Sequence, residues 1–355
     1  MDFPPRPGSS LPRREKSEGG PTEPAAPLPG EDSETGEHRW DAALSPDGSD
    51  ADGSGAGHPV AEPQSPPTAR GRGRRTGRAK RSKEPGRPRR RRSETLARIL
   101  WAIPWILFAV VIVVAGGGVF AAAMVGLAWA AQIELFRMTA RSRPFEAAAF
   151  IATLGMIAGA FFGGTLQILL ALVALFPVML IFALLRPTLT NVTWSMAITV
   201  LAVVWIGLPF AHAVLLRELP LHGGALLVDV LVATFFTDTF AYLGGRMFGQ
   251  RPLAPLVSPN KTIEGLAIGI LGGVLGFWIA GLYQDWLSGP QALIFGLCIA
   301  LLAPLGDLFE SAIKRDLDVK DTGRMLGPHG GLLDRLDAVL FTIVAGYYLS
   351  LLIVF

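Results

Sequence analysis

The residues best suited to chemistry lie between Ser311 and Asp337, in the run SAIKRDLDVKDTGRMLGPHGGLLDRLD. Five cations and five aspartates share this run with a Pro-His-Gly-Gly turn: Lys314, Arg315, Lys320, Arg324 and Arg335, with Asp316, Asp318, Asp321, Asp334 and Asp337. Cationic side chains suit phosphate groups, and carboxylates suit metal ions. Because apolar segments flank the run on both sides, we predict phosphate chemistry at a membrane surface.

Asp307 closes the apolar block that precedes this run. Ser311, Lys314 and Arg315 follow it at positions i+4, i+7 and i+8, so all four side chains share one face of a continuing helix. An ionisable side chain inside a span is a functional candidate. A functional Asp307 is the favoured interpretation, and an interfacial aspartate paired with its own Lys or Arg neighbour is the alternative.

Asp334 and Asp337 stand three residues apart at the start of the last apolar block, on one face of a helix's first turn. The helix dipole favours anions there, which is one explanation for the pair. Together with Asp307 they also form an oxygen-rich set that suits Mg²⁺ beside substrate phosphates. Gly330 and Gly331, just ahead, would let the backbone approach a ligand closely.

A third polar group surrounds the end of the sixth apolar block. Asp238 lies roughly two helical turns inside its expected cytoplasmic end, either in a pocket or paired with a neighbouring helix. Lys261 and Thr262 open the following block, where a helix N-terminus can bind phosphate. For Lys261, an ordinary topological signal is an equally good explanation.

Three other polar residues in apolar blocks have a weaker case for chemistry. We expect His212 to be a hydrogen-bonded buried histidine and Asp229 to be interfacial. Glu134 is expected either to line the site or to mark the membrane interface.

These residues need a framework, and half of the 355 residues are hydrophobic. Residues 1–95 hold few aliphatics and are predicted to be a disordered tail, followed by a membrane-embedded domain in residues 96–355. Nine apolar blocks, each near the roughly 20 residues that cross a bilayer, follow Leu96: 97–115, 117–135, 145–163, 165–185, 193–216, 224–243, 262–283, 291–309 and 336–355. Because backbone groups in lipid must be satisfied within their own segment, we predict an all-α bundle of about nine transmembrane helices.

The connections predict the orientation of these helices. Gly116–Gly118 leave the boundary between the first two apolar blocks open: they could form a tight turn between two spans or a flexible point in one longer element. Lys and Arg favour one side of the alternation, which is typical of cytoplasmic loops; they include Arg137, Arg141, Arg143, Arg186, Arg246, Arg251 and Lys261. We therefore predict a multi-pass protein of the plasma (inner) membrane, with the N-terminus and the polar cluster in the cytoplasm.

The tail changes from acidic to strongly basic, with 13 Lys or Arg residues between Arg70 and Arg92. It is interpreted as a solvated linker that enforces topology, or as a segment attracted to anionic lipid by roughly 1 kcal/mol per basic residue. Nucleic-acid binding is disfavoured because no aromatic residues interleave the charges. The polar N-terminus does not resemble a cleavable signal peptide, and the single cysteine, Cys298, excludes a disulfide framework.

The run from Ser311 to Asp337 resembles the signature of the phosphatidate cytidylyltransferases, or CDP-diacylglycerol synthases. Its fixed positions are filled here by Ser311, Ile313, Lys314, Arg315, Lys320, Asp321, His329, Gly330, Gly331, Asp334, Arg335, Leu336 and Asp337. GDLFES, DTFAYLGGRMFG and SPNKTIEG also look like recurring stretches of that family, so the resemblance covers roughly residues 96–355. Gly327-Pro328 departs from the Pro-Gly of many members. Asp316, Asp318 and Arg324 fall at variable positions and are expected to be solvated.

The resemblance implies transfer of the cytidylyl group of CTP to phosphatidate drawn from the membrane lipids, giving CDP-diacylglycerol and pyrophosphate. It implies Mg²⁺ or another divalent metal on Asp307, Asp334 and Asp337, with Asp238 and Asp321 as weaker candidates. The expected catalytic residues are Lys314, Arg315, Lys320, Asp321 and Ser311, and the expected substrate-binding residues are Lys261, Thr262, His329, Gly330, Gly331 and Arg335. The sequence leaves open a second, monovalent ion and a homodimer through small-residue helix faces.

Three alternatives fit fewer of the residues. A lipid kinase that uses CTP would share the apolar frame and the metal site without needing the full 27-residue match. A transporter would use Asp238 and Asp307 as an ion path but predicts polar residues through the whole membrane depth. A membrane scaffold whose basic tail does the binding leaves the aspartate cluster unexplained.

Overall fold

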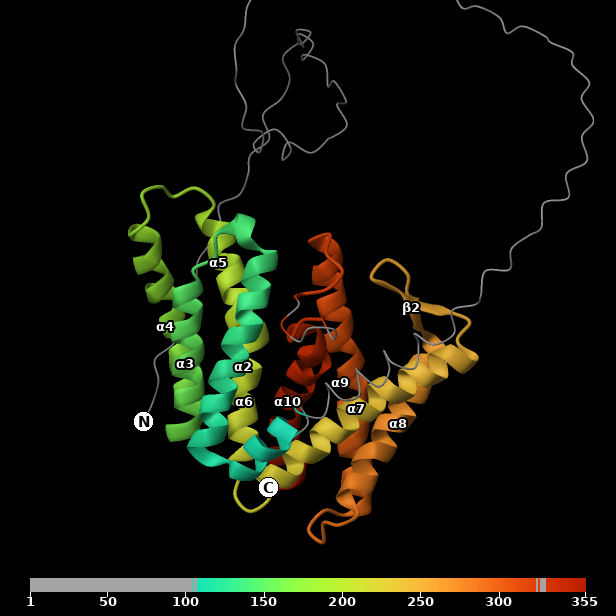
Figure 1. The fold of residues 1–355 in the computed structure, drawn as a ribbon. Coiled ribbons are helices and arrows are strands. Elements are labelled where there is room, and N and C mark those ends of the chain that lie inside the picture. The colour runs from blue at the N-terminus through green and yellow to red at the C-terminus, as the bar shows by residue number, and fades with distance from the viewer. Residues whose placement is uncertain (1–103, 105–106, 324, 326–329) are drawn as a thin grey trace, which may run out of the picture. The chain divides into compact units, whose positions relative to one another are not determined.

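The computed structural model describes residues 104, 107–323, 325 and 330–355. The predicted tail, about half of the first apolar block, Arg324 and His329 therefore lie outside the described residues. The helices follow one another along the chain (Figure 1) as α2 (Gly117–Met138), the short turn η2 (Ala140–Ser142), α3 (Glu146–Phe162), α4 (Thr165–Leu184), α5 (Val192–Leu201), the π-helical segment η3 (Ala202–Gly207), α6 (Leu208–Arg217), α7 (Gly223–Phe248), α8 (Ile263–Gly281), α9 (Gly289–Asp316) and α10 (Leu333–Ile353).

Seven helices within the described ranges are long and apolar enough to cross a membrane. They are α2, α4, the continuous α5–η3–α6 unit, α7, α8, α9 and α10. The apolar helix α3 is shorter, at 17 residues. The predicted all-α, multi-pass architecture is confirmed. The number nine is not confirmed, because about half of the first predicted span lies outside the described residues and α3 falls below the length of the other spans.

The first boundary is a tight turn. Gly116 and Gly117 have φ angles of 59° and 51°, a backbone region that favours glycine. The turn is also tied to the end of α6, since Arg217 Nε donates to the Val113 carbonyl at 2.7 Å and Gly117 N–H donates to Glu218 Oε1 at 2.9 Å. Of the two interpretations of this glycine run, the turn between two helical elements is the one found.

Helix α10 joins the two parts of the bundle. It packs against α9 and α7 and also against α6. Helices α2 to α6 lie together on the left of Figure 1, and α7, α8 and α9 lie on the right. The connection between α9 and α10 therefore lies where side chains from both groups can reach it.

Small residues bring α7 and α8 into close contact. A Cβ atom on Gly265 would lie 2.8 Å from the Ala241 carbonyl oxygen, and one on Gly269 would lie 2.9 Å from the Thr237 carbonyl oxygen. Close backbone approach of this kind is how helices associate in lipid, where burial of apolar side chains gives little advantage. It places Asp238 of α7 near the start of α8.

A two-stranded antiparallel hairpin connects α7 to α8, and the sequence did not predict it. Strand β1 (Pro252–Ala254) pairs with β2 (Ser258–Thr262). Glu264 Oε2 accepts hydrogen bonds from the N–H groups of Gln250 and Arg251, at 3.0 and 3.1 Å. The hairpin is thus anchored to the first turn of α8, directly beside Lys261.

Large apolar side chains cover the outward faces of the helices. Helix α4 is the clearest case, with Leu166, Leu170, Phe176, Ile181 and Leu184 all more than half exposed. Such a surface is unfavourable in water and suits the acyl chains of a bilayer. The fold is therefore that of a multi-pass membrane protein.

Candidate functional site

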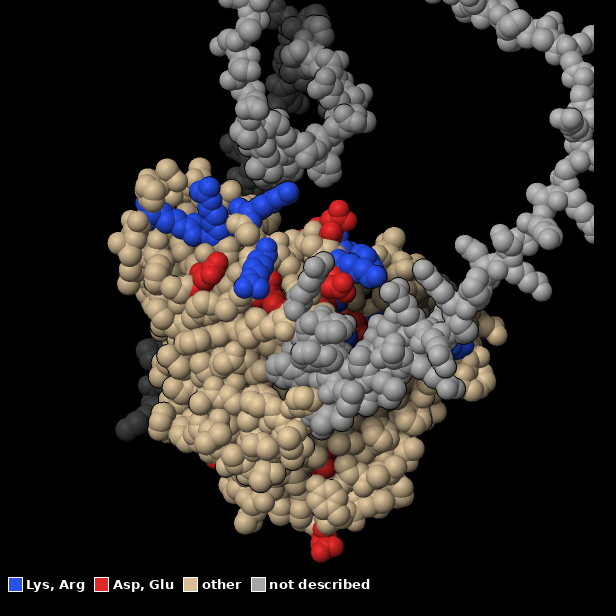
Figure 2. All heavy atoms as spheres, viewed as in Figure 1, with Lys and Arg blue, Asp and Glu red and all other residues tan. Residues whose placement is uncertain are grey.

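Charged side chains gather at the end of the bundle where α9 ends and α10 begins. On the face drawn in Figure 2, most of the Lys and Arg side chains lie toward the upper end, several with Asp and Glu beside them, above a largely uncharged body. The β1–β2 hairpin lies at the same end (Figure 1). The three polar groups predicted from the sequence thus come from segments that meet at one end.

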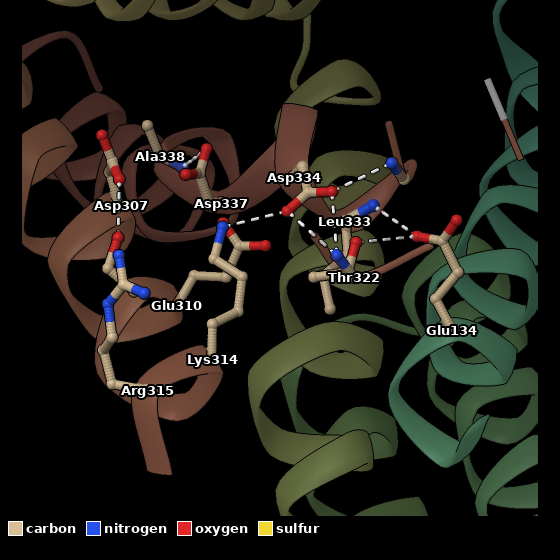
Figure 3. Close-up of polar contacts among 12 residues, drawn as sticks. Glu134, Asp307, Glu310, Lys314, Arg315, Thr322, Leu333, Asp334, Asp337 and Ala338 are labelled. Carbon is tan, nitrogen blue, oxygen red and sulfur yellow. Dashed lines mark hydrogen bonds and ion pairs between the residues drawn. The ribbon is translucent and has the colours of Figure 1, made fainter. Parts of the chain in front are cut away.

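A glycine sets the distance between α9 and α10. A Cβ atom on Gly306 would lie 2.9 Å from Cα of Ala338 and 3.0 Å from the carbonyl carbon of Asp337, so the two backbones are almost in contact. Asp307 follows this glycine directly, and Asp337 lies across from it (Figure 3). Asp337 Oδ1 accepts a hydrogen bond from the Ala338 N–H at 2.8 Å. The close contact of the two helices therefore brings Asp307 and Asp337 into the same region.

Glu310 belongs to the same cluster, and sequence reasoning missed it. Its side chain has no exposed surface, and neither carboxylate oxygen has a hydrogen-bond partner. Lys314 Nζ lies 3.4 Å from Oε2 as an ion-pair partner, and Asp337 acts on Glu310 electrostatically. Glu310, Asp334 and Asp337 thus share one cation, Lys314, in a poorly solvated place, which favours binding of a further cation. Glu310 is an ionisable residue three positions after Asp307 in the same helix, and this position could have identified it from the sequence.

Asp334 ties the two ends of the α9–α10 connection together. Its Oδ1 accepts from Lys314 Nζ at 2.9 Å, while Oδ2 accepts from the N–H groups of Thr322 at 3.0 Å and Gly331 at 2.9 Å (Figure 3). Both oxygens are therefore already engaged by the chain. Asp334 is better arranged to position the connection than to offer a free oxygen to a metal ion.

Asp307 receives partners from two directions. Ser311 Oγ donates to Oδ1 at 3.3 Å, as the shared helix face predicts, and Lys261 Nζ forms an ion pair with Oδ2. Asp238 of α7 is exposed and interacts electrostatically with Asp307, Asp337 and Lys261. The structure therefore brings Asp238, Asp307 and Asp337 into one region from three helices.

Cations line a hollow at the end of α9. Its volume is about 230 Å³, and its walls are Lys314, Arg315, Asp318, Val319 and Lys320. Arg315 Nε donates to the Val257 carbonyl at 3.2 Å, which links α9 to the hairpin. Asp318, expected to be solvated, is exposed and lines this hollow with φ 52°. Three cations against one carboxylate suit a polyanionic ligand.

The remaining predicted residues have varied surroundings. The side chains of Asp321, in the α9–α10 connection, and Arg335, in the first turn of α10, are exposed. Thr262 is the N-cap of α8, because its Oγ1 accepts from the Gly265 N–H at 3.1 Å. Gly330 has φ 86°, a backbone region that favours glycine, and its predicted approach to a ligand stays a prediction. His329 lies outside the described residues, so its predicted role stays a prediction.

The donor chemistry fits a divalent cation, although the side chains do not form a closed site. Carboxylate oxygens are the ligands that Mg²⁺ prefers, and Glu310 and Asp337 supply them in a partly desolvated place. Among the residues that the structure describes, no group of three or more His, Cys, Asp or Glu side chains lies in a metal-holding arrangement. Asp307 forms an ion pair with Lys261 in place of a metal-holding arrangement. The metal site therefore remains a prediction.

Three residues outside the main cluster have clear roles in packing. Glu134 is 1% exposed and accepts hydrogen bonds from the α9–α10 connection, and it is not among the residues that line the hollow. His212 is a hydrogen-bonded buried histidine, as predicted, between the Leu208 carbonyl at 2.9 Å and the Tyr348 hydroxyl at 3.2 Å. Asp229 is fully buried and accepts from Gln284 Nε2 at 2.6 Å, a burial that the sequence did not indicate.

Comparison with known proteins assigns this framework to a family. The model of the cytidylyltransferase family matches residues 96–353, which include all described helices and the whole charged run. The match stops short of the tail, as the composition of residues 1–95 predicts.

Individual relatives match over a shorter stretch. The phosphatidate cytidylyltransferase of Bacillus subtilis is 40% identical over 153 residues, 42% of this chain and 56% of that protein. That of Mycobacterium leprae is 36% identical over 171 residues, 48% of this chain and 54% of that protein. An uncharacterized Escherichia coli protein, YnbB, is 43% identical over 169 residues, 45% of this chain and 53% of that protein. The chain thus spans about half the length of the curated relatives that it matches.

Proposed function

Because the chain belongs to the cytidylyltransferase family, we propose that it transfers the cytidylyl group of CTP to phosphatidate. The products are CDP-diacylglycerol for phospholipid synthesis and pyrophosphate. The observation that carries this proposal is the cation-lined hollow beside a carboxylate cluster, at the polar end of an apolar bundle. At the polar end of the bundle, a membrane lipid can present its phosphate to the hollow, and a nucleotide can enter the hollow from the water. The relatives named phosphatidate cytidylyltransferase support the choice of substrates.

The reaction needs little covalent chemistry from the protein. An ionised oxygen of phosphatidate attacks the α-phosphorus of CTP and forms a new P–O bond. The bond from that phosphorus to the bridging oxygen breaks, and pyrophosphate leaves with the electron pair. No general base is required, since the lipid phosphate is already ionised at neutral pH. Catalysis then consists of holding two anions in line and compensating their charge.

The residues divide this work between cations and carboxylates. Lys314, Arg315 and Lys320, around the hollow, bind phosphate oxygens and compensate their charge. Lys261 of β2, which pairs with Asp307, adds a further positive charge at this end of the bundle. Asp238, Asp307 and Asp337, with Glu310 beside Asp337, would hold a divalent ion such as Mg²⁺, which when bound neutralises charge on the triphosphate and the leaving group.

The site end of the bundle faces the cytoplasm in this proposal. Among the described residues, most of the arginines lie in the connections and helix ends on that side, and cytoplasmic loops are rich in Lys and Arg; they include Arg137, Arg141, Arg143, Arg186, Arg246 and Arg251. With α3 and the first apolar block counted, the chain crosses the plasma membrane nine times. A homodimer through small-residue helix faces stays a prediction from the sequence.

The test is direct transfer of label from CTP into lipid. Full-length protein in mixed micelles is incubated with α-phosphate-labelled CTP, phosphatidate and Mg²⁺, and chloroform-soluble label is identified by chromatography. CDP-diacylglycerol should form, and Asp337→Asn should abolish it. Asp285→Asn, an exposed aspartate in the α8–α9 connection at the far end of α9, should leave the rate unchanged. Absence of labelled lipid with Mg²⁺, Mn²⁺ and Co²⁺ alike would overturn the proposal.

A further inference from the structure

Glu134 of α2 reaches the α9–α10 connection from a distant part of the chain. We propose that it is a positioning residue, which holds the two described ends of this connection, at Thr322 and Leu333, so that the cations beside them receive the phosphates of the nucleotide. The identity of that nucleotide rests on the proposed function. The contact between Glu134 and the α9–α10 connection does not depend on it. It assigns a functional role to a helix that otherwise belongs to the opposite side of the bundle.

A single oxygen of Glu134 holds both ends of the connection. Oε2 accepts from the Leu333 N–H at 2.9 Å and from Thr322 Oγ1 at 3.3 Å (Figure 3). Thr322 follows the end of α9, and Leu333 is the first residue of α10. Because the carboxylate is 1% exposed, water cannot easily replace it as the acceptor.

Helix α10 has no local side-chain cap, and Glu134 supplies one. The N-cap residue Leu332 has no side chain that could accept a hydrogen bond, although the first N–H groups of any helix need acceptors. A carboxylate from α2 satisfies the first of them and also lies favourably in the helix dipole. The cap comes from 199 residues away in sequence, so it forms only when α2 has packed against the other helices.

Two glycines leave room for this carboxylate. A Cβ atom on Gly323 would lie 2.5 Å from Oε1 of Glu134, and one on Gly331 would lie 2.7 Å from Oε2. The same Cβ on Gly331 would lie 2.8 Å from the Gly323 nitrogen, so the two ends of the connection also lie against each other. The glycines at 323 and 331 are therefore explained by the approach of Glu134.

The contact reaches the proposed phosphate-binding cations through one residue. Thr322 is held from two sides, with its hydroxyl on Glu134 and its N–H on Asp334. Asp334 also pairs with Lys314, and Lys320 lies two residues before Thr322. Release of Glu134 would therefore loosen the wall of the hollow without removing any residue that lines it.

This geometry makes a prediction that a metal ligand or catalytic acid would not share. Both hydrogen bonds end on one oxygen, so the carbonyl oxygen of Gln can accept both, and charge is not required. Glu134→Gln should therefore keep the KM for CTP within about twofold of wild type. Glu134→Met removes both acceptors and lowers the population of the competent connection. Apparent nucleotide affinity falls with that population, so the KM for CTP should rise about tenfold or more while kcat changes little.

Gln132 provides a matched control on the same helix. It is fully buried and polar, and its Nε2 donates to Thr153 Oγ1 at 2.7 Å and to the Ala202 carbonyl at 3.2 Å, away from the connection. Gln132→Leu should reduce the yield of folded protein and leave the KM for CTP unchanged. Thr322→Val removes only one of the two contacts of Glu134, and it should raise the KM by about threefold even if Glu134→Met fails to fold.

Hydrogen–deuterium exchange gives a readout that needs no activity. In the full-length protein, peptides containing Thr322 and Leu333 should exchange at least about tenfold faster in Glu134→Met, and at the wild-type rate in Glu134→Gln and Gln132→Leu. If wild type made no CDP-diacylglycerol but showed this exchange pattern, the proposed function would fail and the positioning contact would stand. Unchanged exchange and KM in folded Glu134→Met, or Glu134→Gln as impaired as Glu134→Met, would overturn the inference.

Discussion

Replacement of Gly306 by Ala tests whether contact between α9 and α10 builds the site. The added Cβ would lie 2.9 Å from Cα of Ala338 and 3.0 Å from the carbonyl carbon of Asp337, with the carbonyl oxygen of that residue closer still. Ordinary contact at such a position needs 3.4–4 Å, and the obstructing atoms are backbone atoms. The two helices must therefore separate by roughly 0.5–1 Å, since overpacked sites relax by backbone shifts.

The expected effect on rate is larger than the effect on stability. Overpacking costs about 1–3 kcal/mol, which a bundle of this size should survive. A displacement of about 1 Å between groups that must act together can reduce a rate by roughly 100-fold. Because Asp307 and Asp337 lie on either side of this contact, kcat for CDP-diacylglycerol formation should fall by about 10-fold to 100-fold in Gly306→Ala.

A second glycine of α9 controls for the substitution itself. A Cβ on Gly289 would meet no atom within 4 Å, so Gly289→Ala should keep the wild-type rate. Both variants are purified in detergent, their folded fractions are measured by size-exclusion chromatography, and kcat is expressed per folded protein. A Gly306→Ala protein with wild-type kcat would show that the α9–α10 distance does not control the site.

Three further perturbations address the charges. Lys314→Met leaves Glu310 buried without its cation and Asp334 without one partner. Loss of one member of a buried ion pair costs about 3–5 kcal/mol of folding free energy. Thermal unfolding of this variant in detergent should therefore begin at a clearly lower temperature than that of the wild type. An unchanged unfolding temperature would mean that Glu310 carries no buried charge. Lys261→Met removes the ion pair with Asp307 and should raise the KM for CTP several-fold, whereas a lower KM would indicate that Lys261 blocks the site. Removal of divalent ions with EDTA should abolish transfer, with recovery on titration of Mg²⁺ followed by lipid-soluble label; full activity in EDTA would exclude a required metal ion.

The positions of the helices could be predicted well because lipid imposes one requirement on every span. The predicted block 165–185 became Thr165–Leu184, and the block 193–216 became Val192–Arg217. The polar ends extend beyond the apolar blocks: α9 continues to Asp316, as the continuing helix after Asp307 predicts, whereas the extension of α7 to Phe248 was not predicted. Hydrophobicity marks the membrane-buried part of a helix, whereas its end depends on local contacts beyond the membrane.

The β1–β2 hairpin could not be predicted, because its two strands are short and carry no alternating apolar pattern. Its stability comes from contacts made by other segments, such as Glu264 with the Gln250 and Arg251 N–H groups and Arg315 with the Val257 carbonyl. Glu310 and Glu134 were undervalued for a related reason. Glu134 binds Thr322 and Leu333, far away in sequence, and local spacing gives no indication of such partners. Glu310 has its cation, Lys314, four residues on along the same helix, so only its burial beside Asp337 needed the tertiary structure.

The sequence alone determined the membrane-spanning architecture, the helical face shared by Asp307 and Ser311, and the cation-rich run before α10, because these depend on hydrophobicity and helical periodicity along one segment. Only the tertiary structure decided which carboxylates remain free and which hold the chain. Asp334 and Asp337 look equivalent in sequence, yet Asp334 is saturated by Lys314, Thr322 and Gly331, while Asp337 faces Glu310. That distinction comes from close packing at Gly306 and from Glu134 of α2, and contacts between distant segments have no signal in local spacing.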